Sequence, residues 1–310
     1  MSQLNASPSP AAGSVQTYGW RGYRCAYEVV SNGQTSGDLA LLLIHPIGVG
    51  LSREFWTPFC QAWLDAGDRA PLYLPDLMGC GDSSMPTAAY TPEDWAEQLL
   101  FFLTTVVKRP VVLVAQGALL PVALVLAQKA KETGLVRGLI FAGPPAWPVV
   151  TTETPTWQNR LLWRLFDSPL GLLFYRYARR RQFLESFSEK QLFARSEDVT
   201  DDWLFMLVSG ASDLDSRHAV FSFLAGFWRR DYQRDLEALQ VPVLVVMGTT
   251  ASSISRSGKS ETPDERLRQY LSHLPQGEGI QVEGRNVLPY ESAAEFVKAI
   301  APFVEARSLA

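Results

Sequence analysis

The sequence predicts an α/β fold, with a mostly parallel, doubly wound sheet and an inserted helical cap. Short apolar runs rich in Val and Leu alternate with segments of helical spacing through residues 18–149, and the alternation returns through residues 239–310. Parallel strands joined by crossover helices produce this alternation. Residues 150–238 interrupt it, because they are helical in spacing, aromatic and Arg-rich, with no buried-strand pattern. We therefore expect one α/β core, 18–149 and 239–310, and a cap over 150–238.

Composition indicates a globular protein with a sizeable core. Hydrophobic residues make up 47% of the 310 and charged residues 19%, and a net charge of −4 does not favour nucleic-acid binding. Residues 1–17 are rich in Ser, Pro and Ala and are expected to form a disordered tail. No apolar run approaches the length of a membrane span. The three cysteines lack metal-ligand spacing, so we predict no metal or other cofactor; their odd count favours a reducing compartment, the cytoplasm.

The first part of the chain contains most of the predicted strands. Apolar runs predict strands over residues 24–30, 39–45, 71–75, 111–115 and 136–142. Aromatic residues at helical spacing predict a helix over 54–66. Thr91 and Pro92 mark the start of another helix, which runs to about Val107, because Thr caps a helix and Pro fits its first position. A further helix follows the break at Gln116-Gly117 and continues to Lys129.

The last part of the chain returns to the α/β pattern. A Val-rich run predicts a strand over residues 241–247, and a shorter one is expected near 280–282. Helices are predicted over 264–273 and 292–304 by their spacing. The sheet is therefore expected to continue beyond the cap.

Several strand ends carry loops with recognisable spacing. They read His45-Pro46-Ile47-Gly48, Asp76-Leu77-Met78-Gly79-Cys80-Gly81-Asp82-Ser83, and Ala115-Gln116-Gly117-Ala118-Leu119. In that order they resemble the oxyanion segment, the D-x-x-G-x-G-x-S loop and the nucleophile elbow, G-x-S-x-G, of the α/β-hydrolase family. The resemblance covers nearly the whole chain after the tail, and the first loop is similar to those of cyanobacterial or plastid members.

The departures from the family all concern catalytic positions. The elbow position that carries the family's nucleophile is Gly117 here. Glycine relieves the strain of that turn, because it tolerates a positive φ. The family's acid position is Ala251, and its base position is Val287, or Asn286 if the loop shifts by one residue. Because nucleophile, base and acid act as a unit, we predict that triad chemistry is absent.

The other titratable candidates have alternative interpretations. The chain has three histidines, His45, His218 and His273, and none follows the last predicted strand. His45 is a pocket candidate, although a structural role in the bend it starts is favoured; the other two are expected to be solvated. Asp76 and Asp82 are interpreted as residues that brace their loop, and Cys80 lies between them.

The binding apparatus of such a site can survive the loss of side chains. Backbone N–H groups build an oxyanion hole, and the resemblance implies Ile47 and Ala118 as donors. Gln116 and Asn286 join His45 as pocket candidates. The polar, cationic loop over residues 249–260 could bind an anionic group, or it could simply be solvated.

The cap has a charge of its own. Between residues 151 and 195, eight cations and four anions give +4, interleaved with aromatic residues. The cluster Arg176, Arg179, Arg180 and Arg181 is predicted to contact an acidic partner or an anionic membrane peripherally. The alternative is a cap that packs its aromatics on the core and solvates its arginines.

Two classes of function remain open. The first is a non-catalytic protein that binds an apolar small molecule or a protein partner. The second is an enzyme acting on ester or lipid-like substrates by other chemistry in the same pocket. Only His45, Asp76, Asp82 and Cys80 are candidate titratable groups for the second class.

Overall fold

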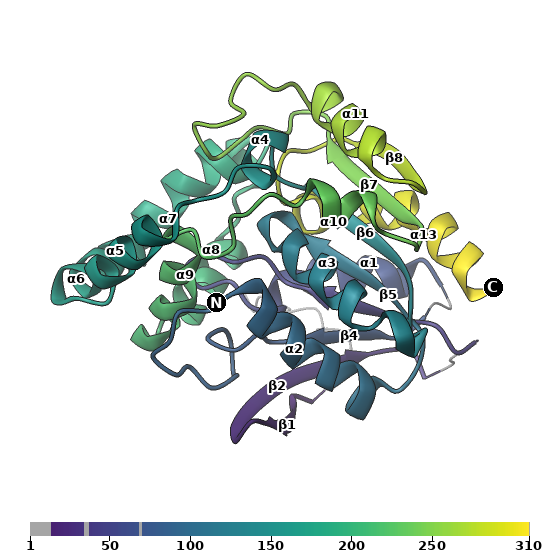
Figure 1. Cartoon of the computed structure of the whole chain (residues 1–310), viewed down its shortest axis with the longest axis horizontal. Coiled ribbons are helices and arrows are strands. Elements are labelled where there is room, and N and C mark those ends of the chain that lie inside the picture. The colour runs from purple at the N-terminus through teal and green to yellow at the C-terminus, as the bar shows by residue number, and fades with distance from the viewer. Residues whose placement is uncertain (1–13, 34–36, 68–69, 310) are drawn as a thin grey trace, which may run out of the picture.

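An eight-stranded sheet forms the centre of the molecule (Figure 1). The computed structural model describes residues 14–33, 37–67 and 70–309. The strand order is β1-β2-β4-β3-β5-β6-β7-β8; β1–β2 and β2–β4 pair antiparallel and the other neighbours pair parallel. The bounds are β1 Gln16–Trp20, β2 Tyr23–Val30, β3 Ala40–Ile44, β4 Leu72–Pro75, β5 Val111–Gln116, β6 Val136–Ala142, β7 Val243–Gly248 and β8 Gly277–Val282. The predicted mostly parallel sheet is confirmed.

Helices cover both faces of this sheet. In β3, Leu42 and Ile44 pack in one core cluster with α2 (Pro92–Phe102) and α3 (Leu120–Lys129). Leu41 and Leu43 pack in the other cluster with α1 (Thr57–Asp65) and α13 (Ala293–Ser308). Since successive side chains of a strand point to opposite faces, a continuous apolar run is buried on both sides.

The helix boundaries follow local signals. Thr91 caps α2 and Thr262 caps α11 (Pro263–His273), each with an acidic residue three positions on that bonds back to the cap. The helix expected over 54–66 is instead a 3₁₀ turn, Arg53–Trp56, followed by α1. The last predicted helix corresponds to α13, and a short additional helix, α12 (Leu288–Glu291), precedes it. Pro58 and Pro289 lie in the first turns of α1 and α12, where a proline fits because the backbone N–H has no acceptor within the helix.

Seven helices connect β6 to β7 and are called the inserted helices. They are α4 Trp147–Val150, α5 Thr156–Phe166, α6 Pro169–Ala178, α7 Arg181–Phe187, α8 Asp201–Gly210, α9 Arg217–Leu224 and α10 Gln233–Glu237. Helix α8 packs on the loop after β3, where a Cβ on Gly50 would lie 1.9 Å from the Leu207 carbonyl oxygen. The Tyr90 N–H donates to Ser222 Oγ of α9 at 2.9 Å. Helices α8 and α9 are thus fixed to loops at the carboxyl edge of the sheet.

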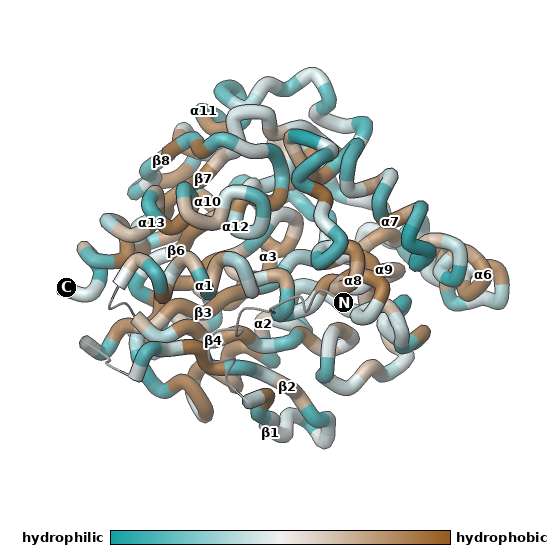
Figure 2. The backbone as a smooth tube through the Cα atoms, turned by 180° about the vertical axis from the view of Figure 1, so that it is seen from behind, coloured by the Kyte–Doolittle hydropathy of each residue, from teal (hydrophilic) through white to brown (hydrophobic). Residues whose placement is uncertain are grey.

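Apolar residues occur both in the sheet and in the inserted helices (Figure 2). The apolar residues of the strands are buried inside the molecule. Helix α6 is also apolar, but it lies at the edge of the molecule away from the sheet, where several of its apolar side chains are exposed. No helix among residues 14–33, 37–67 and 70–309 has both the length and the apolar character to cross a bilayer. Of the expected tail, residues 1–13 lie outside the described residues, but Gln16 and Thr17 belong to β1, so the expected boundary at 17 is too late.

Candidate functional site

The turn after β5 has the geometry of an elbow without a side chain at its tip. Strand β5 ends at Gln116, Gly117 has a φ of 60°, and a 3₁₀ turn over Gly117–Leu119 leads into α3. A Cβ built on Gly117 would meet nothing within 4 Å. The left-handed backbone explains why glycine fits here, and the space beside it is open. A nucleophile could be accommodated, but this residue offers none.

Gln116 connects the elbow to the loop after β8. Its Nε2 donates to the Asn286 carbonyl at 2.7 Å, across 170 residues of sequence. Its Oε1 is buried and has no hydrogen-bond partner within the described part of the chain. A buried amide oxygen without a donor is costly, so this atom is a candidate acceptor for a ligand N–H, O–H or water. This long-range bond has no signal in the sequence.

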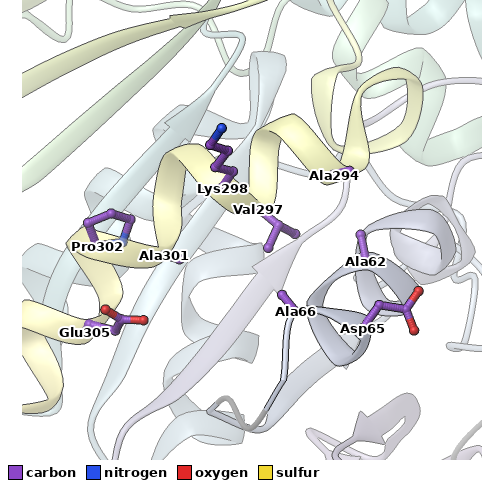
Figure 3. A pocket seen from close by; sticks show the side chains of 9 residues that line it. All are labelled: Ala62, Asp65, Ala66, Ala294, Val297, Lys298, Ala301, Pro302 and Glu305. Atoms are coloured by element: carbon purple, nitrogen blue, oxygen red, sulfur yellow. The ribbon is translucent and has the colours of Figure 1, made fainter.

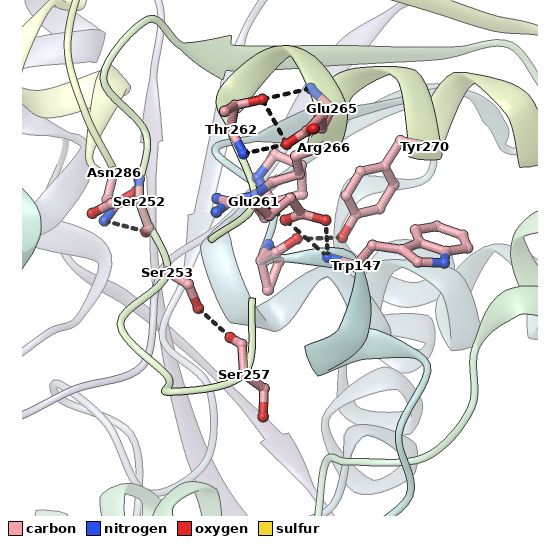
Figure 4. Close-up of polar contacts among 12 residues, drawn as sticks. Trp147, Ser252, Ser253, Ser257, Glu261, Thr262, Glu265, Arg266, Tyr270 and Asn286 are labelled. Carbon is pink, nitrogen blue, oxygen red and sulfur yellow. Dashed lines mark hydrogen bonds and ion pairs between the residues drawn. The ribbon is translucent and has the colours of Figure 1, made fainter. Parts of the chain in front are cut away.

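The loop after β8 places Asn286, rather than Val287, opposite the loop after β7. Asn286 Nδ2 donates to the carbonyls of Ser252 and Gln191 at 3.0 and 2.7 Å, and its Oδ1 accepts from the Ser252 N–H at 3.3 Å (Figure 4). Val287 is buried in the apolar cluster around α13. An amide cannot take up a proton near neutral pH, so Asn286 positions loops and does not act as a base.

The loop after β7 lacks a carboxylate at the expected acid position. Ala251 is buried, and its N–H donates to the Gly248 carbonyl at 3.0 Å. Beside it, Ser252 Oγ accepts from Arg285 Nε and Nη2 at 2.9 and 2.7 Å. Farther along, Glu261 pairs with the buried Arg266 at 2.9 Å and accepts from the Trp147 N–H (Figure 4). The loop is held by contacts within the chain, while its cations Arg256 and Lys259 are exposed.

The expected oxyanion donors lie in the segments that follow β3 and β5, and Ala118 directly follows Gly117 at the elbow. Strands β3 and β5 pair in parallel register, with Ile44 opposite Ala115, so the segments that follow them leave the sheet side by side. Ile47 and Ala118 are both half-buried. Neither N–H has an acceptor within the described ranges. Two free N–H groups, of which that of Ala118 lies at the start of a 3₁₀ turn, could bind a carbonyl or carboxylate oxygen.

The match to known proteins agrees with this arrangement of loops. A model described as "Alpha/beta hydrolase family" matches residues 41–299. The chain belongs to the alpha/beta hydrolase family. Its structure is similar to a thermophilic esterase from Thermogutta terrifontis, with 19% identity and a TM-score of 0.69, over 96% of this chain and 99% of that one. It is also similar to an enol-lactonase from Burkholderia xenovorans LB400, with 15% identity and a TM-score of 0.69, over 94% and 100%. No curated protein sequence matches the chain.

His45 braces a loop of this hydrolase fold and is closed to ligands. The side chain is fully buried, its Nδ1 lies 2.8 Å from the Pro46 carbonyl, and its Nε2 accepts from the Leu77 N–H at 3.1 Å. Burial lowers the pKa of the ring, so His45 is neutral. The pocket role considered for His45 is therefore wrong, and the structural role is the one observed.

The family-like loop over residues 76–83 is organised around a buried carboxylate. Asp76 Oδ1 accepts from the Arg53 N–H at 2.9 Å, and its Oδ2 pairs with the Arg53 guanidinium and accepts from the Asp82 N–H at 2.9 Å. A Cβ on Gly81 would come within 2.2 Å of the Asp76 carboxylate, which explains the glycine. Asp82 pairs with Arg53 at 2.8 Å, and burial raises the pKa of the Cys80 thiol. Asp76 and Asp82 brace the loop through Arg53, as the sequence indicates, and Cys80 is buried beside them.

The remaining two histidines differ from each other. His273 is stacked on Trp147 near the surface, with ring centroids 4.4 Å apart. His218 is buried, contrary to the solvated environment expected for it, because α9 packs beneath α5 and α6. Its Nδ1 lies 3.0 Å from the Asp215 carbonyl, and its Nε2 lies 3.7 Å from Asp167. Burial lowers its pKa.

The four arginines of the predicted contact surface are not equivalent. Arg179 donates to the carbonyls of Ala211 and Ser212 at 2.9 and 3.0 Å, and Arg181 pairs with Asp201 on α8. Arg176 has no acidic partner among the described residues, and Arg180 lies over the Tyr177 ring. Only Arg176 and Arg180 remain available to an outside anion.

A hollow of about 570 Å³ lies between α1 and α13 (Figure 3). It is open to the surface and is bordered by Ala62, Asp65, Ala66, Ala294, Val297, Lys298, Ala301, Pro302 and Glu305. None of these belongs to the elbow or to the loops after β7 and β8. The hollow is therefore separate from the candidate site, and the apolar pocket expected under the cap stays a prediction.

Proposed function

We propose that this chain is a non-catalytic alpha/beta hydrolase that binds an apolar small molecule carrying a carbonyl or carboxyl oxygen at its elbow. Gly117 is the observation that carries the proposal, because the tip of the elbow has open space and no nucleophile. Asn286 and Ala251 at the base and acid positions support it. A triad works as a unit, so a chain lacking all three members has no route to triad hydrolysis.

The retained N–H groups suggest which ligand atoms would bind. Ile47 and Ala118 offer two unpaired donors, which suit one ligand oxygen. Gln116 Oε1 offers a buried acceptor two residues before Ala118. A ligand with an acyl chain and one oxygen-bearing end would use these groups, while a protein segment with the same chemistry is the other partner foreseen.

A hydrolysis assay tests the non-catalytic part of the proposal. Purified protein is incubated with p-nitrophenyl acetate and butyrate beside a heat-denatured control, with and without a serine-directed fluorophosphonate. We expect no turnover above the control and no covalent labelling. Turnover that the fluorophosphonate abolishes would contradict the proposal, because it would require a serine nucleophile.

A thermal-shift titration tests the binding part. Octanoate is the probe, and ligand that binds only the folded state raises the melting temperature. We expect the shift to disappear in Ala118→Pro, which removes one donor, and to persist in Ala118→Gly, which keeps it. Equal shifts in both variants, or no shift in the wild type, would contradict binding at this site.

The second candidate is an enzyme that acts on esters or lipid-like molecules without a triad. The similar structures are named as an esterase and an enol-lactonase, and Ile47 and Ala118 would supply the pair of donors that ester chemistry needs. The groups considered for such chemistry are committed elsewhere, with His45 bonded to backbone and Asp76 paired with Arg53. Turnover that resists the fluorophosphonate but falls in Ala118→Pro would favour this candidate.

A further inference from the structure

The outer side of helices α5 and α6 is apolar. On α5, Trp157, Leu161 and Leu165 recur every four residues, and on α6, Leu170, Leu173, Phe174 and Tyr177 follow the i, i+3, i+4, i+7 pattern. That spacing places each set on one helical face. All seven side chains are 42–66% exposed, and together they are called the α5–α6 face. Exposed apolar side chains aligned on two neighbouring helices mark an interaction site, because isolated apolar residues are ordinary whereas aligned ones are not.

The opposite side of the same helices explains why this face points outward. In α6, Gly171, Tyr175 and Ala178 are buried, and a Cβ on Gly171 would lie 1.9 Å from the Phe166 carbonyl oxygen. Tyr175 Oη lies 2.7 Å from Ser216 Oγ, and its ring packs on Phe221 of α9. These contacts fix the rotation of α6. The two helices form the part of the molecule farthest from the sheet (Figures 1 and 2).

Cations border the α5–α6 face. Residues 156–181 contain six arginines and one acidic residue, Asp167, which gives +5 in a chain of net charge −4. Arg160 and Arg164 follow one flank of the α5 stripe, Arg176 follows one flank of the α6 stripe, and Arg180 lies just after α6 over the Tyr177 ring. All four are exposed, and none has an acidic partner among the residues that the structure describes. Arginines beside an apolar stripe are typical of helices that lie in the interface of an anionic bilayer.

We propose that the α5–α6 face binds an anionic lipid surface, with both helices lying in the plane of the interface. The apolar stripe enters the boundary between headgroups and acyl chains, and Arg160, Arg164, Arg176 and Arg180 contact lipid phosphates. The helices have 11 and 10 residues, so at 1.5 Å per residue they are far too short to span a bilayer. The charge favours a lipid surface over a second copy of this chain, because two copies would oppose +5 to +5.

Vesicle co-sedimentation tests the electrostatic half of the proposal. The full chain is mixed with vesicles of phosphatidylglycerol and phosphatidylcholine, or of phosphatidylcholine alone, at low and high salt. We expect binding to the anionic vesicles at low salt, and at least tenfold weaker binding at high salt or in Arg160→Glu/Arg176→Glu, because exposed charges are screened within a Debye length. Arg137→Glu/Arg234→Glu makes the same charge change at exposed sites on β6 and α10, and it should bind as the wild type does.

Two apolar variants test the insertion of the stripe. Leu161→Gln/Leu173→Gln should weaken vesicle binding at least tenfold with little effect on melting, because both side chains are exposed. Leu309→Gln, at an exposed position near the C-terminus, should bind unchanged. Brominated lipids should quench part of the tryptophan fluorescence, and Trp157→Phe should remove that quenching, which would place the contact at α5.

Three results would overturn the proposal. The first is negligible binding to anionic vesicles at low salt. The second is equal weakening in the Arg160/Arg176 and Arg137/Arg234 variants, which would indicate attraction by general charge alone. The third is a concentration-dependent dimer in sedimentation velocity that Leu161→Gln/Leu173→Gln dissociates, which would assign the face to contact between copies of the chain. None of these bears on the elbow, so the proposed function is tested separately.

Discussion

At Gly117, backbone strain and steric crowding can be told apart, although the two usually occur together at glycine sites. Its φ of 60° disfavours a Cβ, yet a Cβ there would meet no atom within 4 Å. Gly117→Ala should therefore lower the free energy of unfolding by about 1 kcal/mol through backbone strain alone. Gly117→Ser should cost a similar amount and add no activity, because no base faces it. Urea denaturation measures both effects.

Gly19 provides the matched control for this prediction. It lies in β1, where a Cβ would also meet nothing within 4 Å but no left-handed φ occurs. Gly19→Ala should leave stability unchanged or raise it slightly, because alanine restricts the unfolded chain. If both variants behaved alike, the strained elbow at Gly117 would be refuted.

Glu291 makes the stability of the chain depend on pH. Burial raises the pKa of this carboxyl to about 7, although its Oε1 accepts from the Arg285 N–H. The folded state therefore binds a proton more tightly than the unfolded state, so the stabilisation is present at low pH and is lost as pH rises from about 4.5 to 7. Glu291→Gln carries no charge in either state. The free energy of unfolding of this variant, relative to that of the wild type, should therefore rise by about 1 kcal/mol between pH 5 and pH 7.5. The expected change is this small because the carboxyl is partly solvated.

This comparison isolates Glu291 from the buried histidines. His45 and His218 have lowered pKa values, and so they destabilise the fold as pH falls below about 6.5 in wild type and variant equally. Urea midpoints at the two pH values provide the measurement. A constant difference between the two proteins across that range would show that Glu291 does not titrate in the folded state.

At the scale of elements, one carboxylate holds the loops after β3 and β4 together. Asp76 is fully buried and pairs with Arg53, whose side chain is 5% exposed. Asp76→Asn should destabilise the chain by about 3 kcal/mol or more, because it leaves a buried guanidinium without its main counter-charge. Asp82→Asn, whose carboxyl is 56% exposed, should cost under about 1 kcal/mol. Similar losses in chemical denaturation of the two variants would contradict this role of Asp76.

Elements built from neighbouring residues could be predicted from the sequence. Strand β6 begins at Val136 and ends at Ala142, where the apolar run predicts it, and Thr91 caps α2 as expected. Strand β1 was missed, because its alternation is short and its residues are mostly exposed. The contact of Gln116 with Asn286 could not be foreseen, since 170 residues separate them and no local pattern encodes the pairing.

The orientation of the inserted helices could not be predicted from the sequence either. Helical spacing indicates that α6 has an apolar side, but it does not say whether that side meets the core. The alternative in which the cap packs its aromatics inward holds for Tyr175 and Trp203, which are buried. It fails for Trp157 of α5 and for Phe174 of α6, which are exposed; on α6, Gly171 and Tyr175 occupy the inner side instead.

For the whole molecule, we can test whether the fold still places the three triad positions for catalysis by restoring a nucleophile, an acid and a base together. The sheet presents all three positions at its carboxyl edge, with Gly117 after β5, Ala251 after β7 and Asn286 after β8. Gly117→Ser/Ala251→Asp/Asn286→His should hydrolyse p-nitrophenyl acetate at a measurable rate, whereas each single change should not. The reason is that a serine needs a base, and the base needs an orienting acid.

The choice of the third position makes the experiment sensitive to the structure. Gly117→Ser/Ala251→Asp/Val287→His introduces the same three residue types, but it buries the histidine in the apolar cluster around α13. That protein should be inactive, because a histidine there faces neither the elbow nor the loop after β7. Because either triple variant could be unstable, both are compared only after melting shows that they fold. Activity in the Val287 variant and not in the Asn286 variant would mean that the loop after β8 is shifted by one residue from the structure described.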